Sequence, residues 1–173
     1  MRKGVAQVMK VAAGVRLVCF DVDGVVNDGG FYYLSEEPSV AVRFWSRDGH
    51  GFQLLREVGI QIAWVSGNRW PAVQARAERL LIPHLFLGTA DKAGSVRYQA
   101  GALGIPLGQV AYVGDDVNDL PAMALVGLPI AVADADWEVR ARATYVTKAP
   151  GGHGAAREVA DLILAAKRGA GDG

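Results

Sequence analysis

Short apolar runs alternate with amphipathic segments along most of this chain, and the alternation limits the folds that it can adopt. Six runs are rich in branched or aromatic residues and too short for helices, which is typical of buried strands. They cover residues 15–20, 60–65, 84–87, 110–113, 128–132 and, more weakly, 144–146. Strands that alternate with helices form βαβ units, so the sequence predicts a doubly wound α/β fold with a parallel sheet.

The amphipathic segments between these runs predict helices. Asp48 is expected to cap a helix that ends before Gly59, Pro71 suits the first turn of a second, and Asp91 begins a third that ends at Gly104. The predicted buried positions recur at helical spacing. They are Val73, Ala77, Leu80 and Leu81 in the second helix, and Val159, Leu162, Ile163 and Ala166 in a helix near the C-terminus.

Residues 29–45 interrupt this rhythm. Their sequence predicts a β-hairpin with its turn at residues 36–38, inserted after the first strand. We expect residues 1–13 to be a loosely ordered extension, residues 14–168 to form one domain and residues 169–173 to be a flexible tail. The sequence shows no internal repeat and no linker of domain size.

Charge and cysteine content narrow the possible partners and setting. The 173 residues include 18 Lys and Arg and 18 Asp and Glu, which argues against a general affinity for nucleic acid. No apolar stretch reaches the ~20 residues that a membrane span needs. Cys19 is the single cysteine, so no internal disulfide can form, and its apolar surroundings favour a buried structural thiol. We expect a cytoplasmic protein with neither a membrane nor a nucleic acid as partner.

Polar residues follow four of the predicted strands. In an open parallel sheet the carboxyl ends of the strands meet at one edge, where ligands bind. Clustered carboxylates repel one another and need a cation, and an oxygen-rich site suits Mg²⁺. A hydroxyl, backbone amides and a lysine suit phosphate oxygens. The residues are Asp21, Asp23, Ser66, Gly67, Asn68, Lys92, Asp115, Asp116, Asn118 and Asp119.

Each of these features also has an ordinary structural explanation. The Asp21–Gly24 segment alone is typical of a turn, Ser66 alone of a strand exit, and Lys92 alone of a solvated helix. Their consistent placement after four strands favours a functional site.

The same residues carry a family resemblance. The chain resembles the haloacid dehalogenase superfamily of phosphotransferases at four places, which are DVDGVVND (21–28), VSGN (65–68), Lys92 and GDDVNDLPAM (114–123). Over residues 15–165 the chain resembles the capless sugar-acid phosphatases that act on 3-deoxy-D-manno-octulosonate 8-phosphate. The segments that carry this closer match include FWSRDGHG (44–51), VGLPIAVADA (126–135) and GGHGAAREVADLIL (151–164).

The resemblance implies catalytic roles for particular residues. Asp21 would attack phosphorus to form an aspartyl-phosphate, and Asp23 would protonate the leaving alcohol and then activate water. Ser66 and Lys92 would hold the transferred group. Mg²⁺ would be bound by Asp21, the backbone carbonyl of Asp23, and Asp115.

Two nearby carboxylates have less definite roles. Asp119 could orient Lys92. Asp116 could support the metal ligands or contact the metal through water, and the sequence does not choose between these roles.

The resemblance also implies a substrate, though three positions depart from the pattern. It places Trp45, Ser46, Arg47, Asp48, Gly49, Gly67, Asn68 and Arg76 around a phosphorylated sugar acid. Gln53, Asn68 and His153 stand where those phosphatases usually carry arginine. The expected substrate is therefore the octulosonate 8-phosphate, with a nine-carbon keto-sugar acid 9-phosphate as the alternative.

The spacing leaves no room for a cap domain. Only 25 residues separate Ser66 from Lys92, and 22 separate Lys92 from Asp115. A capless site is open to water, which the related phosphatases exclude by forming homotetramers with packed hairpins. Five aromatic residues would suit either that interface or the chain's own core. They are Phe31, Tyr32, Tyr33, Phe44 and Trp45.

Two other functional classes share some of these features. A signalling receiver domain has a similar set of groups, but its acidic pair precedes its phosphorylated aspartate, and the order here is the reverse. A non-catalytic oligomerisation module related to sugar-nucleotide enzymes would tolerate loss of the catalytic residues. Asp21, Asp23, Ser66, Lys92 and Asp115 are all present, which argues against that class.

Overall fold

The centre of the protein is a parallel sheet of six strands, seen in a computed structural model that describes residues 4–34 and 39–171. The strand order is β5-β4-β1-β6-β7-β8, and every neighbouring pair is parallel. All six predicted strands are confirmed. Their bounds are Leu17–Asp21 (β1), Gln61–Ser66 (β4), His84–Leu87 (β5), Val110–Gly114 (β6), Leu128–Ala131 (β7) and Tyr145–Val146 (β8).

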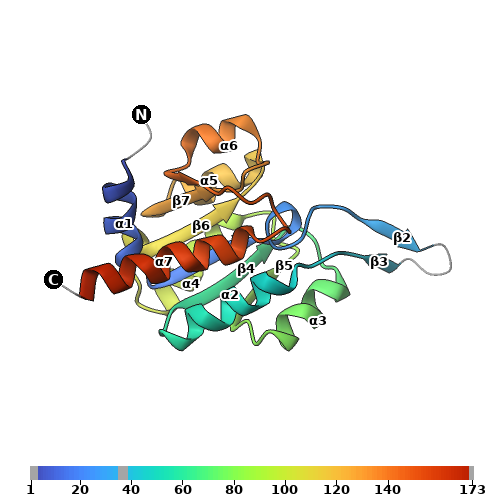
Figure 1. The fold of residues 1–173 in the computed structure, drawn as a ribbon. Helices are drawn as coiled ribbons and strands as arrows, with labels where there is room; N and C mark the ends of the chain where they lie inside the picture. The colour runs from blue at the N-terminus through green and yellow to red at the C-terminus, as the bar shows by residue number, and fades with distance from the viewer. Residues whose placement is uncertain (1–3, 35–38, 172–173) are drawn as a thin grey trace.

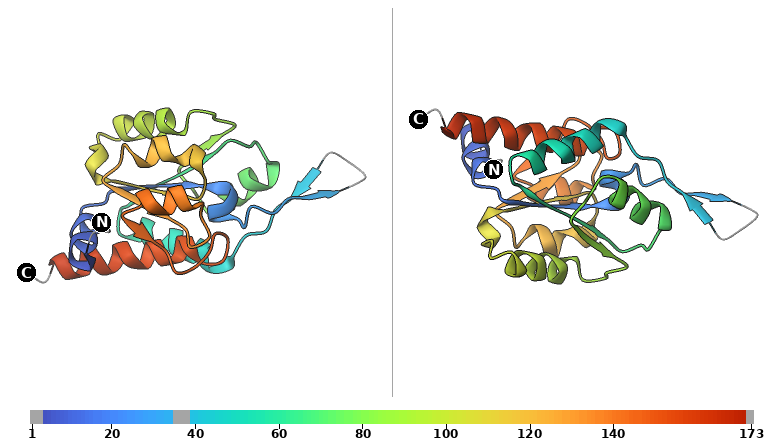
Figure 2. Two further views of the ribbon diagram at one scale, coloured as in Figure 1. Left: turned by 90° about the horizontal axis from the view of Figure 1, so that it is seen from above. Right: turned by 90° about the horizontal axis from the view of Figure 1, so that it is seen from below.

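Helices cover both faces of this sheet (Figures 1 and 2). Helices α2 and α7 lie on one face, and α4 and α5 lie on the other. In the described part of the chain, no helix combines the length and the apolar character needed to cross a membrane. The bounds are Val5–Ala13 (α1), Ser46–Glu57 (α2), Pro71–Arg79 (α3), Lys92–Ala102 (α4), Leu120–Met123 (α5), Trp137–Arg142 (α6) and Ala155–Gly171 (α7).

The strand order determines where a ligand can bind. From β1 the chain moves outward to β4 and β5, and it then crosses to β6 on the other side of β1. The order in which strands are added to the sheet therefore reverses between β1 and β6. Open α/β sheets bind their ligands at such a point, beyond the carboxyl ends of the strands. Asp21, Ser66 and Gly114 are the last residues of β1, β4 and β6.

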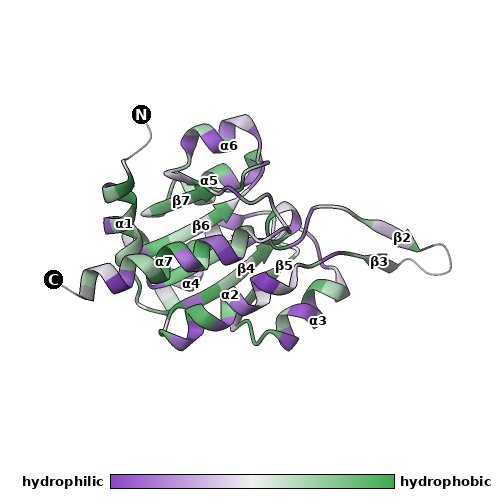
Figure 3. Cartoon of the chain, viewed as in Figure 1, coloured by the Kyte–Doolittle hydropathy of each residue, from purple (hydrophilic) through white to green (hydrophobic). Residues whose placement is uncertain are grey.

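Large apolar side chains fill the space between the sheet and α2. Phe20, Phe52 and Trp64 are fully buried, with ring centroids 5.1 Å apart for Phe20 and Phe52 and 5.4 Å apart for Phe52 and Trp64. The strands are accordingly mostly hydrophobic in Figure 3. Cys19 is also buried, and burial raises the pKa of its thiol to about 12. The thiol therefore packs as a structural group.

The N-terminal segment is more ordered than the sequence suggested. Val5–Ala13 form helix α1, and Val8 and Ala12 are buried beside α7 because the apolar residues recur on one helical face. The expectation of a loose extension was wrong for this segment. Helix α7 likewise continues through residues 169–171, which were expected to be a tail. Residues 1–3 and 172–173 lie outside the described residues.

Two details of the predicted helices were also wrong. Helix α2 begins at Ser46, before Asp48, and the Asp48 carboxylate instead accepts a hydrogen bond of 2.8 Å from the backbone N–H of Arg157 in α7. Helix α3 ends at Arg79, so Leu81 falls beyond it and is 71% exposed. The predicted cap of α4 is confirmed, because Asp91 accepts from the Gly94 N–H at 2.7 Å.

The predicted hairpin is present and projects away from both termini (Figure 1). Its antiparallel strands are β2, Tyr32–Leu34, and β3, Ser39–Ala41. The turn predicted at residues 36–38 lies outside the described residues. In residues 4–34 and 39–171 this hairpin is the only insertion into the βαβ pattern, so no cap domain covers the sheet there.

The apolar face of α7 should contribute strongly to stability. Ile163 is fully buried, and its replacement by Ala should lower the free energy of unfolding by about 2–5 kcal/mol, because a cavity forms where the side chain was. Urea denaturation measures the loss. Arg168→Ala, at an exposed position in the same helix, is the control and should change stability by less than about 0.5 kcal/mol. Equal effects of the two variants would contradict this packing.

Candidate active site

A polar cavity of about 410 Å³ opens at the carboxyl ends of the central strands. Segments from four parts of the chain line it, as the strand-end argument predicted. The lining residues are Asp21, Asp23, Gly24, Gly29, Phe31, Gly67, Asn68, Lys92, Asp115, Asp116 and Asn118.

A sharp turn after β1 brings two acidic loops together. Gly24 has a φ of 89°, a left-handed conformation that favours glycine. A Cβ at this position would also collide with the carboxylate of Asp115. Glycine at position 24 therefore allows the loop after β1 to approach the loop after β6.

A buried ion-pair network lies at the base of the cavity. The Nζ of Lys92 donates to Asp21 Oδ1 at 2.6 Å, to Asp119 Oδ1 at 2.7 Å and to Asn118 Oδ1 at 3.1 Å. Lys92 and Asp21 are 6% and 3% exposed, and Asp119 is fully buried. A buried charge needs such partners, because removal from water otherwise costs several kcal/mol.

Asp119 organises the loop after β6. In addition to Lys92, it accepts from the Tyr112 hydroxyl at 2.7 Å and from the backbone N–H groups of Asp115 at 2.9 Å and Asp116 at 3.3 Å. The expected orienting contact with Lys92 is thus present. Asp116, by contrast, lines the cavity and accepts from the Val117 N–H at 2.7 Å.

Three side-chain donors surround the carboxylate of Asp23. Ser66 Oγ and Asn68 Nδ2 donate to its Oδ2 at 3.0 and 2.9 Å, and Asn27 Nδ2 donates to its Oδ1 at 2.8 Å. The Asn68 N–H in turn donates to Ser66 Oγ at 3.0 Å. Asp23 is therefore held in one orientation at the cavity wall.

Burial and like charge control the protonation of this site. Burial, followed by the negative charge of Asp119, raises the pKa of Asp21 well above its usual range despite the opposing effect of Lys92. The same two causes raise the pKa of Asp115 to about 7. Burial alone would lower the pKa of Lys92, but the Asp21 and Asp119 carboxylates outweigh it and the pKa is raised. The site thus holds more acidic side chains than basic ones, and a bound cation would offset their negative charge.

The donor set fits a hard divalent cation. Carboxylate oxygens of Asp21, Asp115 and Asp119 lie within 4.8 Å of one another. Asp119 already accepts four hydrogen bonds from its neighbours, whereas Asp21 and Asp115 line the cavity. Oxygen ligands with room for water and phosphate suit Mg²⁺. Asp21 and Asp115 are therefore the side chains best placed to bind it.

The predicted substrate-binding residues are divided between regions. Gly67 and Asn68 line the polar cavity. Trp45 and Arg47 line a separate cavity of about 300 Å³, together with His153 and other residues of the α7 region. Ser46 is exposed.

The other three lie in or near the protein interior. Asp48 and Gly49 are buried, and the guanidinium of Arg76 lies 5.7 Å from the ring centroid of Phe44. Within the described part of this chain, Trp45, Ser46, Arg47, Asp48, Gly49 and Arg76 do not line the polar cavity. Their role in substrate binding stays a prediction.

The predicted interface aromatics are divided in a similar way. Tyr32 and Tyr33 are 60% and 75% exposed on the hairpin. Phe44 stacks on the buried ring of Trp64, with 6.4 Å between centroids, and so belongs to the chain's own core. Phe31 lies in the cavity wall, against Trp70 at 5.4 Å.

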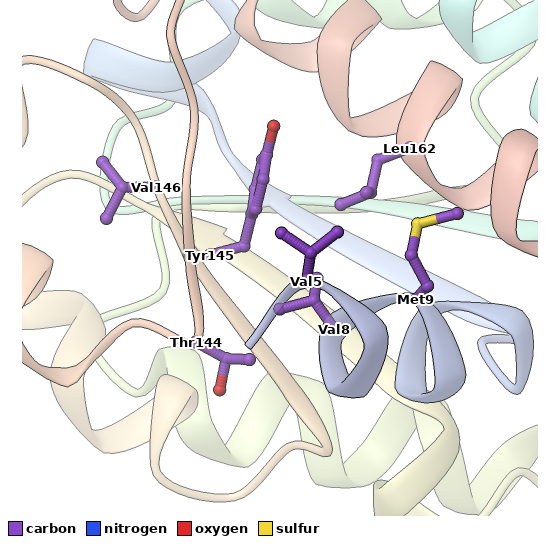
Figure 4. A pocket seen from close by; sticks show the side chains of 7 residues that line it. All are labelled: Val5, Val8, Met9, Thr144, Tyr145, Val146 and Leu162. Carbon is purple, nitrogen blue, oxygen red and sulfur yellow. The ribbon is translucent and has the colours of Figure 1, made fainter. Parts of the chain in front are cut away.

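An apolar cavity of about 230 Å³ lies elsewhere, between α1, β8 and α7 (Figure 4). Val5, Val8 and Met9 of α1 face Tyr145 of β8 and Leu162 of α7 across it. Its lining carries no charged side chain, so it does not suit a phosphate.

Two residues that hold the side chains of the site in place were not singled out from the sequence. Asn27 and Tyr112 read as ordinary buried positions, because their role depends on partners that only the fold brings near. Asn27 does occur within the DVDGVVND segment, which was a usable signal. Phe31 was expected in either a hairpin interface or the chain's own core, and the structure places it in the wall of the cavity.

Comparisons with known proteins agree with this geometry. Residues 84–159 match the model of the haloacid dehalogenase-like hydrolase family. The 3-deoxy-D-manno-octulosonate 8-phosphate phosphatase of Yersinia pestis is 42% identical over 160 residues, covering 92% of this chain and 85% of that protein.

Solved structures give the same result. That of the phosphatase of the same name from Moraxella catarrhalis, in complex with magnesium ion, phosphate ion and KDO, has a TM-score of 0.92 and 36% identity, covering 95% of this chain and 94% of that one. The cobalt-bound deoxy-D-mannose-octulosonate 8-phosphate phosphatase of Haemophilus influenzae has a TM-score of 0.88 and 37% identity, covering 91% and 92%.

The raised pKa of Asp115 predicts how stability depends on pH without metal. A carboxyl whose folded pKa exceeds its unfolded value binds more protons in the folded state, so it lowers stability as pH rises through that interval. For Asp115 the interval runs from its ordinary value to about 7. In EDTA, the free energy of unfolding should therefore fall less between pH 4.5 and pH 8 in Asp115→Asn than in the unmodified protein. Identical pH dependence in urea denaturation would contradict this result.

Proposed function

The chain belongs to the haloacid dehalogenase-like hydrolases, and on this basis we propose that it hydrolyses a sugar-acid phosphate through a phosphorylated Asp21. It is a phosphoric monoester hydrolase that requires Mg²⁺, in keeping with its relatives. The observation that carries the mechanism is the convergence of Asp21, Asp23, Lys92 and Asp115 in one cavity.

Each side chain has a step that its position allows. Asp21 bonds to phosphorus as the bond to the leaving alcohol breaks, and Asp23 supplies the proton to that alcohol. The Asp23 carboxylate then takes a proton from the water that attacks the aspartyl-phosphate, which releases phosphate. Lys92 donates to Asp21 Oδ1, so it orients the nucleophile and places positive charge beside the transferred group.

The metal would be held by Asp21, Asp115 and the backbone carbonyl of Asp23. Mg²⁺ at these ligands would offset the charge of the phosphate and of the clustered carboxylates. Ser66 would contact the phosphate with its hydroxyl. Asp119 keeps Lys92 and the Asp115 loop in place and is not needed as a ligand.

The substrate that the relatives favour is 3-deoxy-D-manno-octulosonate 8-phosphate. A nine-carbon keto-sugar acid 9-phosphate is the second candidate, because Gln53, Asn68 and His153 remove three expected cations. The guanidinium of Arg43 is a further cation near this region. Its Nη1 lies 3.1 Å from His153 Nε2 and 3.3 Å from Asp28 Oδ2. The non-catalytic module has no support from this geometry, because the catalytic groups are in contact with one another.

Assembly and location complete the proposal. We propose a homotetramer in the cytoplasm, in which hairpins of neighbouring chains pack together and limit access of water to the cavity. The hairpin supports this assembly, because Tyr32, Tyr33 and Leu34 are 60%, 75% and 55% exposed on strand β2. Three adjacent exposed apolar side chains are typical of a surface that another protein covers.

Phosphate release across a substrate panel tests the activity. The panel should contain octulosonate 8-phosphate, nine-carbon keto-acid 9-phosphates and simple sugar phosphates, each with Mg²⁺ and with EDTA. We expect Mg²⁺-dependent turnover with the highest kcat/KM for the octulosonate. Asp21→Asn should lower kcat by at least about 10³-fold without loss of the folded structure. An active Asp21→Asn protein would exclude this mechanism, and preference for a nine-carbon acid would change the substrate.

Light scattering after size-exclusion chromatography tests the assembly. Tyr33→Asp should reduce the molar mass below that of a tetramer, because it places a charge in the proposed interface. Tyr98→Asp is the matched control, since Tyr98 is 69% exposed and belongs to α4, a helix that lies away from the hairpin in Figure 1. Tetramers that persist in the Tyr33 variant, or a monomeric unmodified protein, would refute the proposed interface.

A further inference from the structure

Two asparagine amides contact the proposed acid/base Asp23 from opposite sides of its carboxylate. Asn68 Nδ2 donates to Oδ2 at 2.9 Å, and Asn27 Nδ2 donates to Oδ1 at 2.8 Å. Asn68 follows β4, and Asn27 follows the turn after β1. Both asparagines thus converge on one catalytic side chain.

The surrounding donors fix the orientation of the Asn27 amide. Its Oδ1 accepts from the backbone N–H of Gly29 at 2.8 Å and of Gly24 at 3.3 Å. Backbone N–H groups can only donate, so they select the amide oxygen and turn Nδ2 toward Asp23. Asn27 is fully buried, which leaves its amide no alternative partner in water.

A similar argument orients the groups on the Oδ2 side. Ser66 Oγ accepts from the Asn68 N–H at 3.0 Å, so its own hydrogen is directed at Asp23 Oδ2. Oδ2 therefore accepts two hydrogen bonds, from Ser66 and from Asn68. A carboxylate oxygen has two acceptor positions, so those of Oδ2 are filled. Among residues 4–34 and 39–171, Oδ1 has only the Asn27 contact, which leaves its other position open.

We propose that Asn27 and Asn68 are positioning residues that hold Asp23 so that Oδ1 carries the proton delivered to the leaving alcohol. This inference rests on the proposed phosphatase function. It assigns the proton that Asp23 transfers to one atom, Oδ1. The Oδ1–H bond breaks as the alcohol oxygen leaves phosphorus and accepts that proton. In the second half of the reaction, Oδ1 takes a proton from the attacking water and Asp23 is restored.

Asn68 has a particular part in this arrangement. Ser66 is also expected to contact the phosphate, and its hydroxyl hydrogen cannot be directed at phosphate and at Asp23 together. The amide of Asn68 then keeps one acceptor position of Oδ2 filled when the substrate binds. This role differs from that of the arginine expected at position 68, which could offer charge to the substrate.

Leaving-group dependence separates this role from a general structural one. A sugar phosphate releases a basic alkoxide that needs a proton, whereas p-nitrophenyl phosphate releases a weakly basic phenolate that does not. The constant kcat/KM reports the steps up to departure of the alcohol when that departure is irreversible. Asn68→Ala should lower kcat/KM for the best sugar phosphate of the panel by about 100-fold and that for p-nitrophenyl phosphate by less than about 5-fold.

Two further variants make the test independent of one substitution. Asn68→Asp keeps the size of the side chain and replaces the donor with an acceptor, so it should show the same selective loss. Asn27→Asp keeps an oxygen for Gly24 and Gly29 but removes the donor to Oδ1, with the same expectation. Gln74→Ala is the matched control, because Gln74 Nε2 donates to Glu78 at 3.0 Å on the exposed face of α3. It should leave both substrates unaffected.

The outcomes distinguish the two levels of the proposal. Selective loss for the sugar phosphate in variants whose melting temperature shows a folded protein supports the positioning role. Equal loss for both substrates, or no loss, overturns that role while the phosphatase function stands. An unmodified protein without turnover of any phosphomonoester overturns both.

Discussion

Lys92 is almost fully buried between the carboxylates of Asp21 and Asp119, and the rest of the cavity depends on this contact. The Nζ of Lys92 is 2.6 and 2.7 Å from the two carboxylates. Without Lys92, three carboxylates within 4.8 Å of one another would repel at the ends of β1 and β6. The sheet brings the acidic loops together, and the lysine makes their proximity stable.

The network also explains why negative charge remains available for a metal. One lysine faces Asp21, Asp115 and Asp119, and Asp119 uses its acceptors on Lys92, Tyr112 and two backbone N–H groups. Burial, together with the negative charge of Asp119, therefore raises the pKa values of Asp21 and Asp115 above their ordinary range. Asp119 is therefore a supporting carboxylate, whereas Asp21 and Asp115 face the cavity.

Strand-end chemistry was predictable from the sequence, because the fold itself follows from hydrophobic runs. Asp21, Ser66 and Asp115 occur immediately at or after such runs, and parallel strands bring their carboxyl ends to one edge. The contact between Lys92 and Asp119 was anticipated only through the family resemblance. Asn27 was not anticipated, since its partners are set by the left-handed turn at Gly24, which periodicity does not reveal.

Other differences have equally specific causes. Val8 and Ala12 are buried because α7 packs against α1, and the local sequence of residues 1–13 does not reveal this contact. Asp48 lost its expected capping role to a contact with Arg157, more than 100 positions away. Trp45 and Arg47 lie at a second cavity, and their contact with substrate stays a prediction.

Chemical trapping of the intermediate tests the central claim most directly. The enzyme is mixed with its best substrate and Mg²⁺, quenched in acid during turnover, and reduced with borohydride, which converts an acyl phosphate to an alcohol. Peptide mass spectrometry should then find homoserine at position 21 and unmodified aspartate at positions 23, 115 and 119. Reduction at another aspartate, or none at all in an enzyme that is turning over, would contradict the assignment of Asp21 as the nucleophile.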